Sequence, residues 1–184
     1  MIMTFRDKRR FHLGVAFYFC QEGEIMKKNN IQTLVFNSVI AAIYVALTFV
    51  SSALGLASGV IQLRLSEALC ILPIFTPAAV PGLFIGCLLA NILTGCIFID
   101  IIFGSIATLI GAIFTRMLRK YKLLPLLPPI LSNTIIVPFI LKFAYCFEGS
   151  YLWFVFTIFV GEFLSCGVLG YLLKKVMDKY KMNF

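Results

Sequence analysis

The sequence predicts an all-α integral membrane protein with six transmembrane helices, a short second helix and both termini in the cytoplasm. The chain has 184 residues, of which 61% are hydrophobic and 13% charged, and its mean hydropathy is +0.99. Soluble domains are about 45–50% apolar and about 25% charged, so the excess apolar side chains require a lipid environment. A spanning helix needs about 20 residues, which leaves room for five to seven helices with short loops but for no folded soluble domain. An ordinary cytosolic enzyme, a nucleic-acid-binding domain and a disordered chain are therefore excluded.

The first 25 residues differ from the rest of the chain. Their one apolar stretch, residues 13–20, is too short to span a bilayer, and no small-residue cleavage site follows it. Residues 22–24, Glu-Gly-Glu, back-translate readily into a purine-rich run that resembles a ribosome-binding site ahead of Met26. We therefore expect Met26 to be the true start, residues 1–25 to be an extension and residues 26–184 to form the membrane domain.

The first three helices are predicted by apolar runs with clear ends. Residues 31–54 form the first run, which ends at Gly55. The second run, residues 61–75, rises only about 22 Å as an α-helix. We expect it to be a short or partly re-entrant helix whose polar end is covered by protein. The third run, residues 78–98, has Pro81 near its start, where a helix accepts proline.

The last three helices are bounded in the same way. Asp100 precedes the fourth run, residues 101–118, and a basic cluster closes it. The fifth run, residues 123–145, begins among prolines, which favour the first turn of a helix. A polar bend at residues 148–150 leads into the sixth run, residues 151–173, and lysines follow that run.

Lysine and arginine predict the orientation, because they favour the cytoplasmic side of a membrane. With six spans and both termini inside, the outer segments hold only Arg64 and Lys142 of the basic residues that flank the runs. The inner segments hold ten of them: Lys27, Lys28, Arg116, Arg119, Lys120, Lys122, Lys174, Lys175, Lys179 and Lys181. Five spans would place one terminal lysine cluster on the wrong side. The net charge of +8 follows from this rule rather than from a nucleic-acid partner.

Motifs for catalysis are missing from the sequence. It contains no phosphate-binding loop of the form G-x-x-x-x-G-K-[ST], no H-E-x-x-H motif and a single histidine, His12, in the expected extension. The six cysteines include no C-x-x-C pair and read as small buried hydrophobic residues. We therefore expect no enzyme activity, no metal and no cofactor. Energy for any transport must come from an ion gradient or from another polypeptide.

Polar residues inside the apolar runs are the candidate ligand-binding residues, because burying them in a bilayer is costly. They are Arg64, Glu67, Asn91, Asp100, Asn133 and Glu162. Most lie in the half of the membrane expected to face outward, which suits a site loaded from outside. Glu162 is the strongest candidate, because it lies about 16 Å along the sixth helix and a mid-membrane carboxylate needs a partner or a role.

The other five candidates have structural alternatives that the sequence leaves open. Arg64 and Glu67 are three residues apart and can pair on one helix face. Asp100 can cap the fourth helix. Asn91 and Asn133 can join neighbouring helices by hydrogen bonds.

Small residues predict close helix contacts at two places. Ser38, Ala42 and Ala46 recur every four residues in the first helix, and Gly82 and Gly86 do so in the third. Such spacing lets another helix approach closely, but it does not identify the partner.

Several stretches of the sequence are informative when they are taken together. They are residues 62–69 (QLRLSEAL), 75–87 (FTPAAVPGLFIGC), 100–105 (DIIFGS), 127–133 (LPPILSN) and the Gly161-Glu162 pair. Together they resemble the QueT family of queuosine-precursor transporters, the substrate-binding S components of energy-coupling factor (ECF) uptake systems. The resemblance runs from about Met26 to the end of the chain. It implies a six-helix S component in the bacterial cytoplasmic membrane, surrounded by membrane lipid, that captures its ligand from outside.

The resemblance also implies partners and a substrate. An S component docks on a transmembrane T component that is driven by two cytosolic ATPases, and it often does so through an A-x-x-x-A motif in its first helix. Ala42 and Ala46 match that motif. The implied substrate is 7-aminomethyl-7-deazaguanine or a close relative.

The chemistry of such a ligand can be compared with the candidate residues. A carboxylate can accept from the N1–H and the exocyclic amine of a deazaguanine at once. The ring carbonyl needs a donor such as Arg64 or Asn133, the aminomethyl group needs a second carboxylate, and the flat ring favours an aromatic face. The sequence does not decide which of the three carboxylates, Glu67, Asp100 or Glu162, contacts which ligand group. Glu162 is the preferred candidate for the guanine edge.

Two other functions stay open. One is an S component or an ion-coupled carrier for another vitamin-like molecule. A carrier would work without ATPases. The other is an intramembrane enzyme, against which the near absence of histidine counts.

Overall fold

The computed structural model describes residues 30–56, 62–146 and 148–180. The chain divides into two compact units, residues 1–35 and 36–184. The described part of the first unit is the beginning of one helix, and the fold described below is that of the second. The predicted extension, residues 1–25, and the predicted start at Met26 lie outside the described residues.

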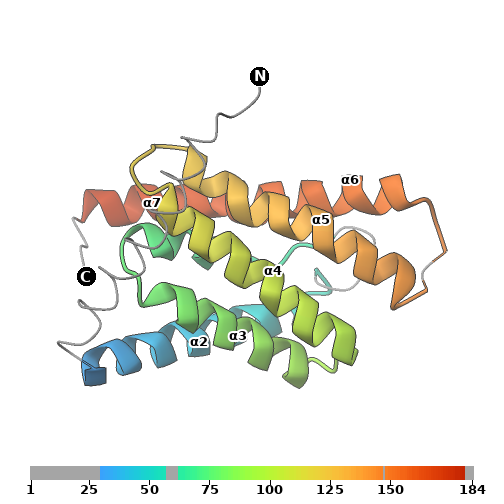
Figure 1. Cartoon of the computed structure of the whole chain (residues 1–184), viewed down its shortest axis with the longest axis horizontal. Coiled ribbons are helices and arrows are strands. Elements are labelled where there is room, and N and C mark those ends of the chain that lie inside the picture. The colour runs from blue at the N-terminus through green and yellow to red at the C-terminus, as the bar shows by residue number, and fades with distance from the viewer. Residues whose placement is uncertain (1–29, 57–61, 147, 181–184) are drawn as a thin grey trace, which may run out of the picture. The chain divides into compact units, whose positions relative to one another are not determined.

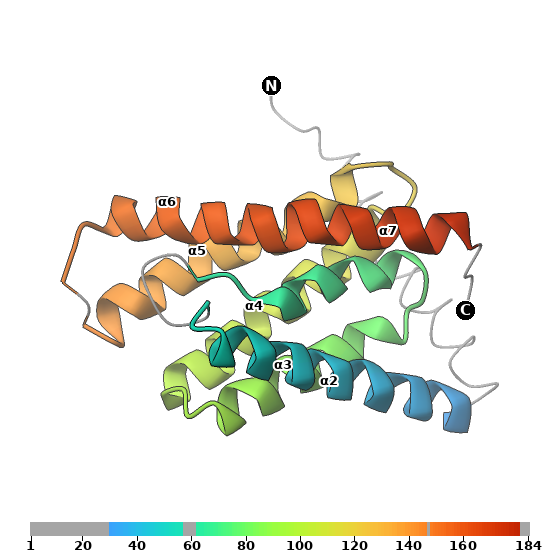
Figure 2. The same cartoon turned by 180° about the vertical axis from the view of Figure 1, so that it is seen from behind.

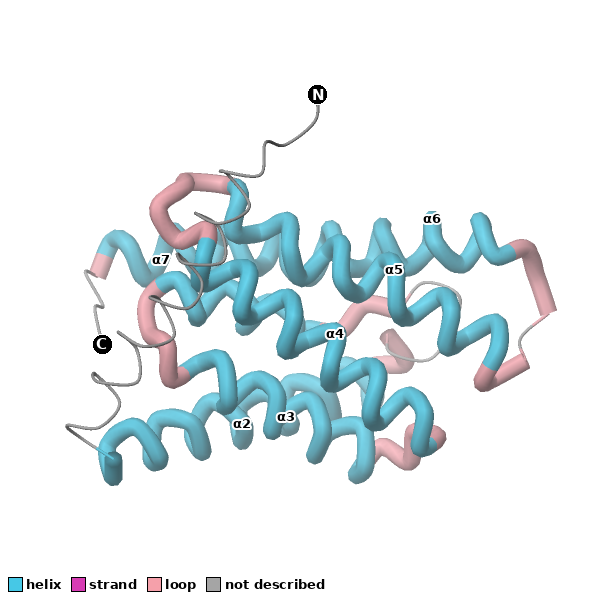
Figure 3. The backbone as a smooth tube through the Cα atoms, viewed as in Figure 1, coloured by secondary structure: helices cyan, strands magenta, loops and turns pink. Residues whose placement is uncertain are grey.

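The described residues form helices joined by short loops and contain no strand, which confirms the all-helical fold class (Figures 1 and 3). Every predicted run is helical over most of its length. The elements are α2 (Asn30–Ala53), η1 (Leu65–Ile74), α3 (Ala79–Leu93), α4 (Phe98–Met117), η2 (Leu124–Leu126), α5 (Leu127–Phe143), α6 (Tyr151–Glu162), η3 (Phe163–Leu169) and α7 (Gly170–Lys179). The last three form one continuous helix (Figure 2).

Four described helical segments are long and apolar enough to cross a membrane. They are Ile31–Ala53, Phe98–Met117, Leu124–Phe143 and Tyr151–Lys179. The second and third predicted helices are shorter, since η1 has 10 residues and α3 has 15. Six full crossings with both termini in the cytoplasm therefore remain a prediction.

The second helix is short, as predicted, and it is a 3₁₀-helix. Pro73 lies inside η1 and has no backbone N–H to donate. The carbonyls of Pro73 and Ile74 at the end of η1 each lie 3.1 Å from Nη1 of Arg116. Arg116, which the topology argument counts as a cytoplasmic charge, is only 9% exposed. It is a buried donor that satisfies the last carbonyls of η1.

The predicted close contact at Gly82 and Gly86 is confirmed, and the neighbour is α2. A Cβ atom on Gly82 would lie 2.9 Å from the Asn37 carbonyl oxygen, and one on Gly86 would lie 2.8 Å from the Tyr44 Cβ. Both glycines therefore let α3 pack directly on the buried face of α2.

The second set of small residues, which we call the stripe and which consists of Ser38, Ala42 and Ala46, lies on an exposed face of α2. All three residues are exposed, whereas Ile40 and Tyr44 on the opposite face belong to the main hydrophobic core. The stripe is therefore accessible from the outside of this unit.

Candidate functional site

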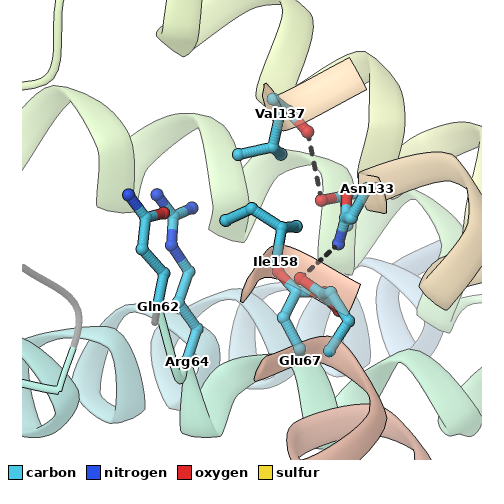
Figure 4. A pocket seen from close by; sticks show the side chains of 9 residues that line it. Gln62, Arg64, Glu67, Asn133, Val137 and Ile158 are labelled. Carbon is cyan, nitrogen blue, oxygen red and sulfur yellow. Dashed lines mark hydrogen bonds between the residues drawn. The ribbon is translucent and has the colours of Figure 1, made fainter. Parts of the chain in front are cut away.

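A pocket lies between the start of η1 and helices α4, α5 and α6. Its walls are formed by Gln62, Arg64, Glu67, Gly104, Thr108, Asn133, Val137, Ile158 and Glu162 (Figure 4). Four of the six residues that the sequence selects come together here, from three separate parts of the chain. These four are Arg64, Glu67, Asn133 and Glu162.

Glu162 is the pocket carboxylate that has an oxygen without a hydrogen-bond partner. Asn133 donates its Nδ2 hydrogen to Oε1 of Glu162 at 3.0 Å. Oε2 of Glu162 is buried and has no hydrogen-bond partner. Burying a polar atom without a partner is unfavourable, so Oε2 is an acceptor available to a ligand.

The helix that carries Glu162 has two unusual features at this level. Gly161 allows the extended segment before η1 to lie against the helix, because a Cβ atom there would be 2.2 Å from the Gln62 carbonyl oxygen. The seven residues that follow Glu162, Phe163–Leu169, form a π-helix. Such segments occur frequently at functional sites, and this one begins directly after the pocket carboxylate.

Glu67 lies in the first turn of η1 and is almost fully buried, with 2% exposed. Its Oε1 accepts from the Tyr44 hydroxyl at 2.5 Å, and its Oε2 accepts from the Cys70 thiol at 3.0 Å. Arg64, which the spacing allows to pair with Glu67, donates instead to Oδ1 of Asn91 at 3.4 Å. The two pocket charges on this segment therefore have different hydrogen-bond partners.

Asn91 and Asp100 do not line the pocket but lie beside it. Asn91 is 1% exposed and donates to the backbone carbonyl of Asp100 at 3.5 Å. Oδ2 of Asp100 accepts from the Tyr145 hydroxyl at 3.1 Å, and that hydroxyl accepts from the Ile97 N–H at 3.4 Å. Asp100 does not cap α4 with its side chain, because no side-chain hydrogen bond caps the start of that helix. The two residues instead connect Arg64 to the segment after α5.

Tyr145 lies beyond the end of α5, outside the membrane-spanning segments. Partial burial and the neighbouring Asp100 carboxylate raise the pKa of its hydroxyl above the ordinary value. The phenol is therefore protonated at physiological pH and able to donate to Asp100.

Sequence reasoning does not identify several of the pocket contacts. Tyr44 stands in an apolar run, where a tyrosine cannot be distinguished from a packing residue.

The apolar walls of the pocket are aliphatic, formed by Val137 and Ile158, so the expected aromatic platform is absent from the residues that line the pocket. The free space is about 10 Å³, which is about enough for one water molecule. A ring-sized ligand can enter only if the walls move apart.

Among the described residues, no three His, Cys, Asp or Glu side chains are grouped so that they could hold a metal ion. The pocket therefore offers hydrogen bonds and charges from side chains: one guanidinium, two carboxylates and two amides. This is a set that binds and orients a polar ligand.

Comparison with known proteins decides the family. The model of the QueT transporter family matches residues 34–179. The chain belongs to the QueT transporter family. One curated relative, the queuosine precursor transporter QueT of Lactococcus lactis subsp. cremoris (strain MG1363), is 33% identical over 85 residues. The match covers 46% of this chain and 50% of that relative, so it spans half of the relative's length. No solved structure matches the chain.

Membership of the QueT family confirms three expectations. The family to which the chain belongs is one of transporters and not of enzymes. Family membership and the four long apolar helices together identify the protein as a multi-pass protein of the cell membrane. The pocket that contains Glu162 is therefore the candidate ligand site of a QueT-family transporter.

Proposed function

We propose that this protein is the substrate-binding component of an ECF-type uptake system and that it captures a queuosine precursor of the 7-deazaguanine type from outside the cell. The observation that carries the proposal is the Oε2 atom of Glu162, a buried acceptor without a donor in a pocket that also holds Arg64. The Lactococcus relative is named a queuosine precursor transporter, which supports the same substrate class.

The ligand's groups correspond to those of the pocket. The N1–H and the exocyclic amine of a deazaguanine are adjacent donors, and a carboxylate can accept both in a bidentate, charge-assisted arrangement. Glu162 supplies that carboxylate, because each of its oxygens can accept more than one hydrogen bond and only Oε1 has a partner, Asn133. Arg64 supplies a donor for the ring carbonyl. Glu67 supplies a second negative charge for a cationic aminomethyl group.

Energy coupling in this proposal comes from other polypeptides. The sequence has no nucleotide-binding loop, so a transmembrane T component and two cytosolic ATPases would drive release to the inside. The exposed stripe that contains Ala42 and Ala46 on α2 is the proposed docking face for the T component. Uptake that continues in cells without the ATPases would reject this coupling and favour an ion-coupled carrier.

The test is calorimetric binding of 7-aminomethyl-7-deazaguanine to the purified protein. We expect the wild-type chain to bind and Glu162→Gln to weaken binding by about 1.5–3 kcal/mol, the range for hydrogen bonds to a charged group, which is about ten- to a hundred-fold in affinity. The matched control is Glu148→Gln, since Glu148 is exposed in the loop before α6. Its affinity should equal that of the wild type.

Two results would reject the assignment. No binding of any deazaguanine by the wild-type chain would remove the substrate class. An unchanged affinity of Glu162→Gln, together with a lower melting temperature, would make Glu162 a residue that only joins helices. The guanine-edge role would then pass to Glu67 or Asp100.

A further inference from the structure

Three polar residues mark the buried face of α2. Tyr44, Thr48 and Ser51 are spaced four and three residues apart, so they lie along one side of the helix. Their exposed fractions are 1%, 4% and 0%. Each therefore needs a hydrogen-bond partner inside the protein.

All three find partners at the start of η1, the element that carries Glu67. The Tyr44 hydroxyl donates to Glu67, and the Thr48 hydroxyl donates to Oγ of Ser66 at 2.9 Å. Oγ of Ser51 accepts from the backbone N–H of Leu65 at 2.9 Å. The buried face of α2 is thus bonded to three successive residues of η1.

Only one of these bonds reaches a residue that lines the pocket. Ser66 and Leu65 are not in the pocket wall, whereas Glu67 is. The other hydrogen bond to Glu67 comes from Cys70, a thiol on η1 itself and a weak donor. The strong donor to Glu67 therefore comes from a different helix, α2.

We propose that Tyr44 is a positioning residue of the binding pocket, which holds the Glu67 carboxylate in place from the buried face of α2. This inference rests on the proposed function, because it treats the pocket as a ligand site. It assigns the first helix a part in binding that is separate from any role of its exposed face.

The test compares two variants that each remove one hydroxyl of α2 and keep its bulk. Tyr44→Phe removes the donor to Glu67, and Thr48→Val, one turn along, removes the donor to Ser66. We expect Tyr44→Phe to weaken binding of 7-aminomethyl-7-deazaguanine about tenfold and Thr48→Val to leave affinity unchanged. In a Glu67→Gln background, Tyr44→Phe should weaken binding by much less than tenfold, since a double-mutant cycle isolates the pair.

Infrared spectroscopy supplies a measurement that needs no ligand. The carboxyl or carboxylate band that disappears in Glu67→Gln should shift in Tyr44→Phe and stay in place in Thr48→Val. Unchanged affinity in Tyr44→Phe would overturn the inference, and so would an equal loss in both variants, which would indicate general support of η1. If the wild-type chain binds no deazaguanine, the proposed function fails. An unshifted Glu67 band in Tyr44→Phe would then overturn the positioning role independently.

Discussion

Asn133 on α5 and Glu162 on α6 are 29 residues apart in sequence, yet Nδ2 of Asn133 lies 3.0 Å from Oε1 of Glu162. The contact is buried, with 4% of Asn133 and 7% of Glu162 exposed. One amide hydrogen bond fixes one carboxylate oxygen and leaves the other without a partner. The pair therefore orients an acceptor toward the pocket rather than neutralising it.

Replacement of Asn133 by leucine tests this orientation. Asn133→Leu keeps the size of the side chain but removes the donor, so Oε1 of Glu162 loses its partner. We expect deazaguanine affinity to fall about tenfold or more, on the order of 1.5–3 kcal/mol for a hydrogen bond to a charged group. Titration calorimetry and a melting curve on the same sample measure both effects.

The neighbouring residue provides the control for Asn133→Leu. Oγ1 of Thr134 is buried without a hydrogen-bond partner. Thr134→Val should leave affinity unchanged and preserve or raise the melting temperature, because an unsatisfied polar atom is replaced by an apolar one. Equal affinities for Asn133→Leu and the wild type would show that Glu162 does not need its amide partner.

Gly161 tests the close approach between α6 and the segment before η1. In Gly161→Ala the new Cβ would meet the Gln62 carbonyl oxygen at 2.2 Å, and a backbone atom cannot give way as a side chain can. Overpacking of this kind costs about 1–3 kcal/mol. We expect a lower melting temperature and weaker ligand binding, because the same segment leads to Arg64.

The control lies in the same long helix. In Gly167→Ala the nearest atom to the new Cβ is Cδ2 of the Phe163 side chain at 3.3 Å. A side chain can shift by a few tenths of an ångström, so this variant should melt and bind as the wild type does. If both alanine variants have the same melting temperature and the same ligand affinity, the Gln62 contact does not determine the pocket's shape.

The exposed face of α2 can be tested by adding bulk. Ala46→Leu should leave ligand binding intact and abolish transport, because the larger side chain keeps a docking helix at a distance. Ile43 is also exposed on α2 but lies about 100° around the helix from Ala42, so Ile43→Leu should preserve both properties. Cellular uptake and binding by the purified protein are the two measurements. Wild-type transport by Ala46→Trp would contradict docking at this face.

Topology can be tested with a cysteine that the chain already has. Cys146 is exposed in the connection between α5 and α6, which the six-span topology places outside. With the other five of the six cysteines replaced, a membrane-impermeant maleimide should label Cys146 in intact cells. A cysteine placed at exposed Tyr121, in a variant that also carries Cys146→Ser, should react only after lysis. Labelling at position 121 in intact cells would refute the orientation.

The sequence predicts the helices well because apolar runs in a membrane protein are long and are interrupted by few residue types. It also predicts four pocket residues, since a charge or amide in an apolar run, such as Glu162, is conspicuous. It does not predict Tyr44, because an aromatic residue in such a run is equally compatible with packing. Nor does it separate Asp100, which bonds to Tyr145, from the residues that line the pocket. That distinction depends on contacts 45 residues apart in sequence.

The small free space of the pocket, about 10 Å³, has a kinetic consequence. A deazaguanine ring is many times larger than a water molecule, so binding must be linked to an opening of the walls. The apparent affinity is then the intrinsic affinity reduced by the fraction of molecules that are open. Association should be slower than it would be at a site that is already open, because binding requires a conformational change. Once the walls close again, the same barrier slows escape, so a captured ligand would stay bound long enough for a slower step to act on it.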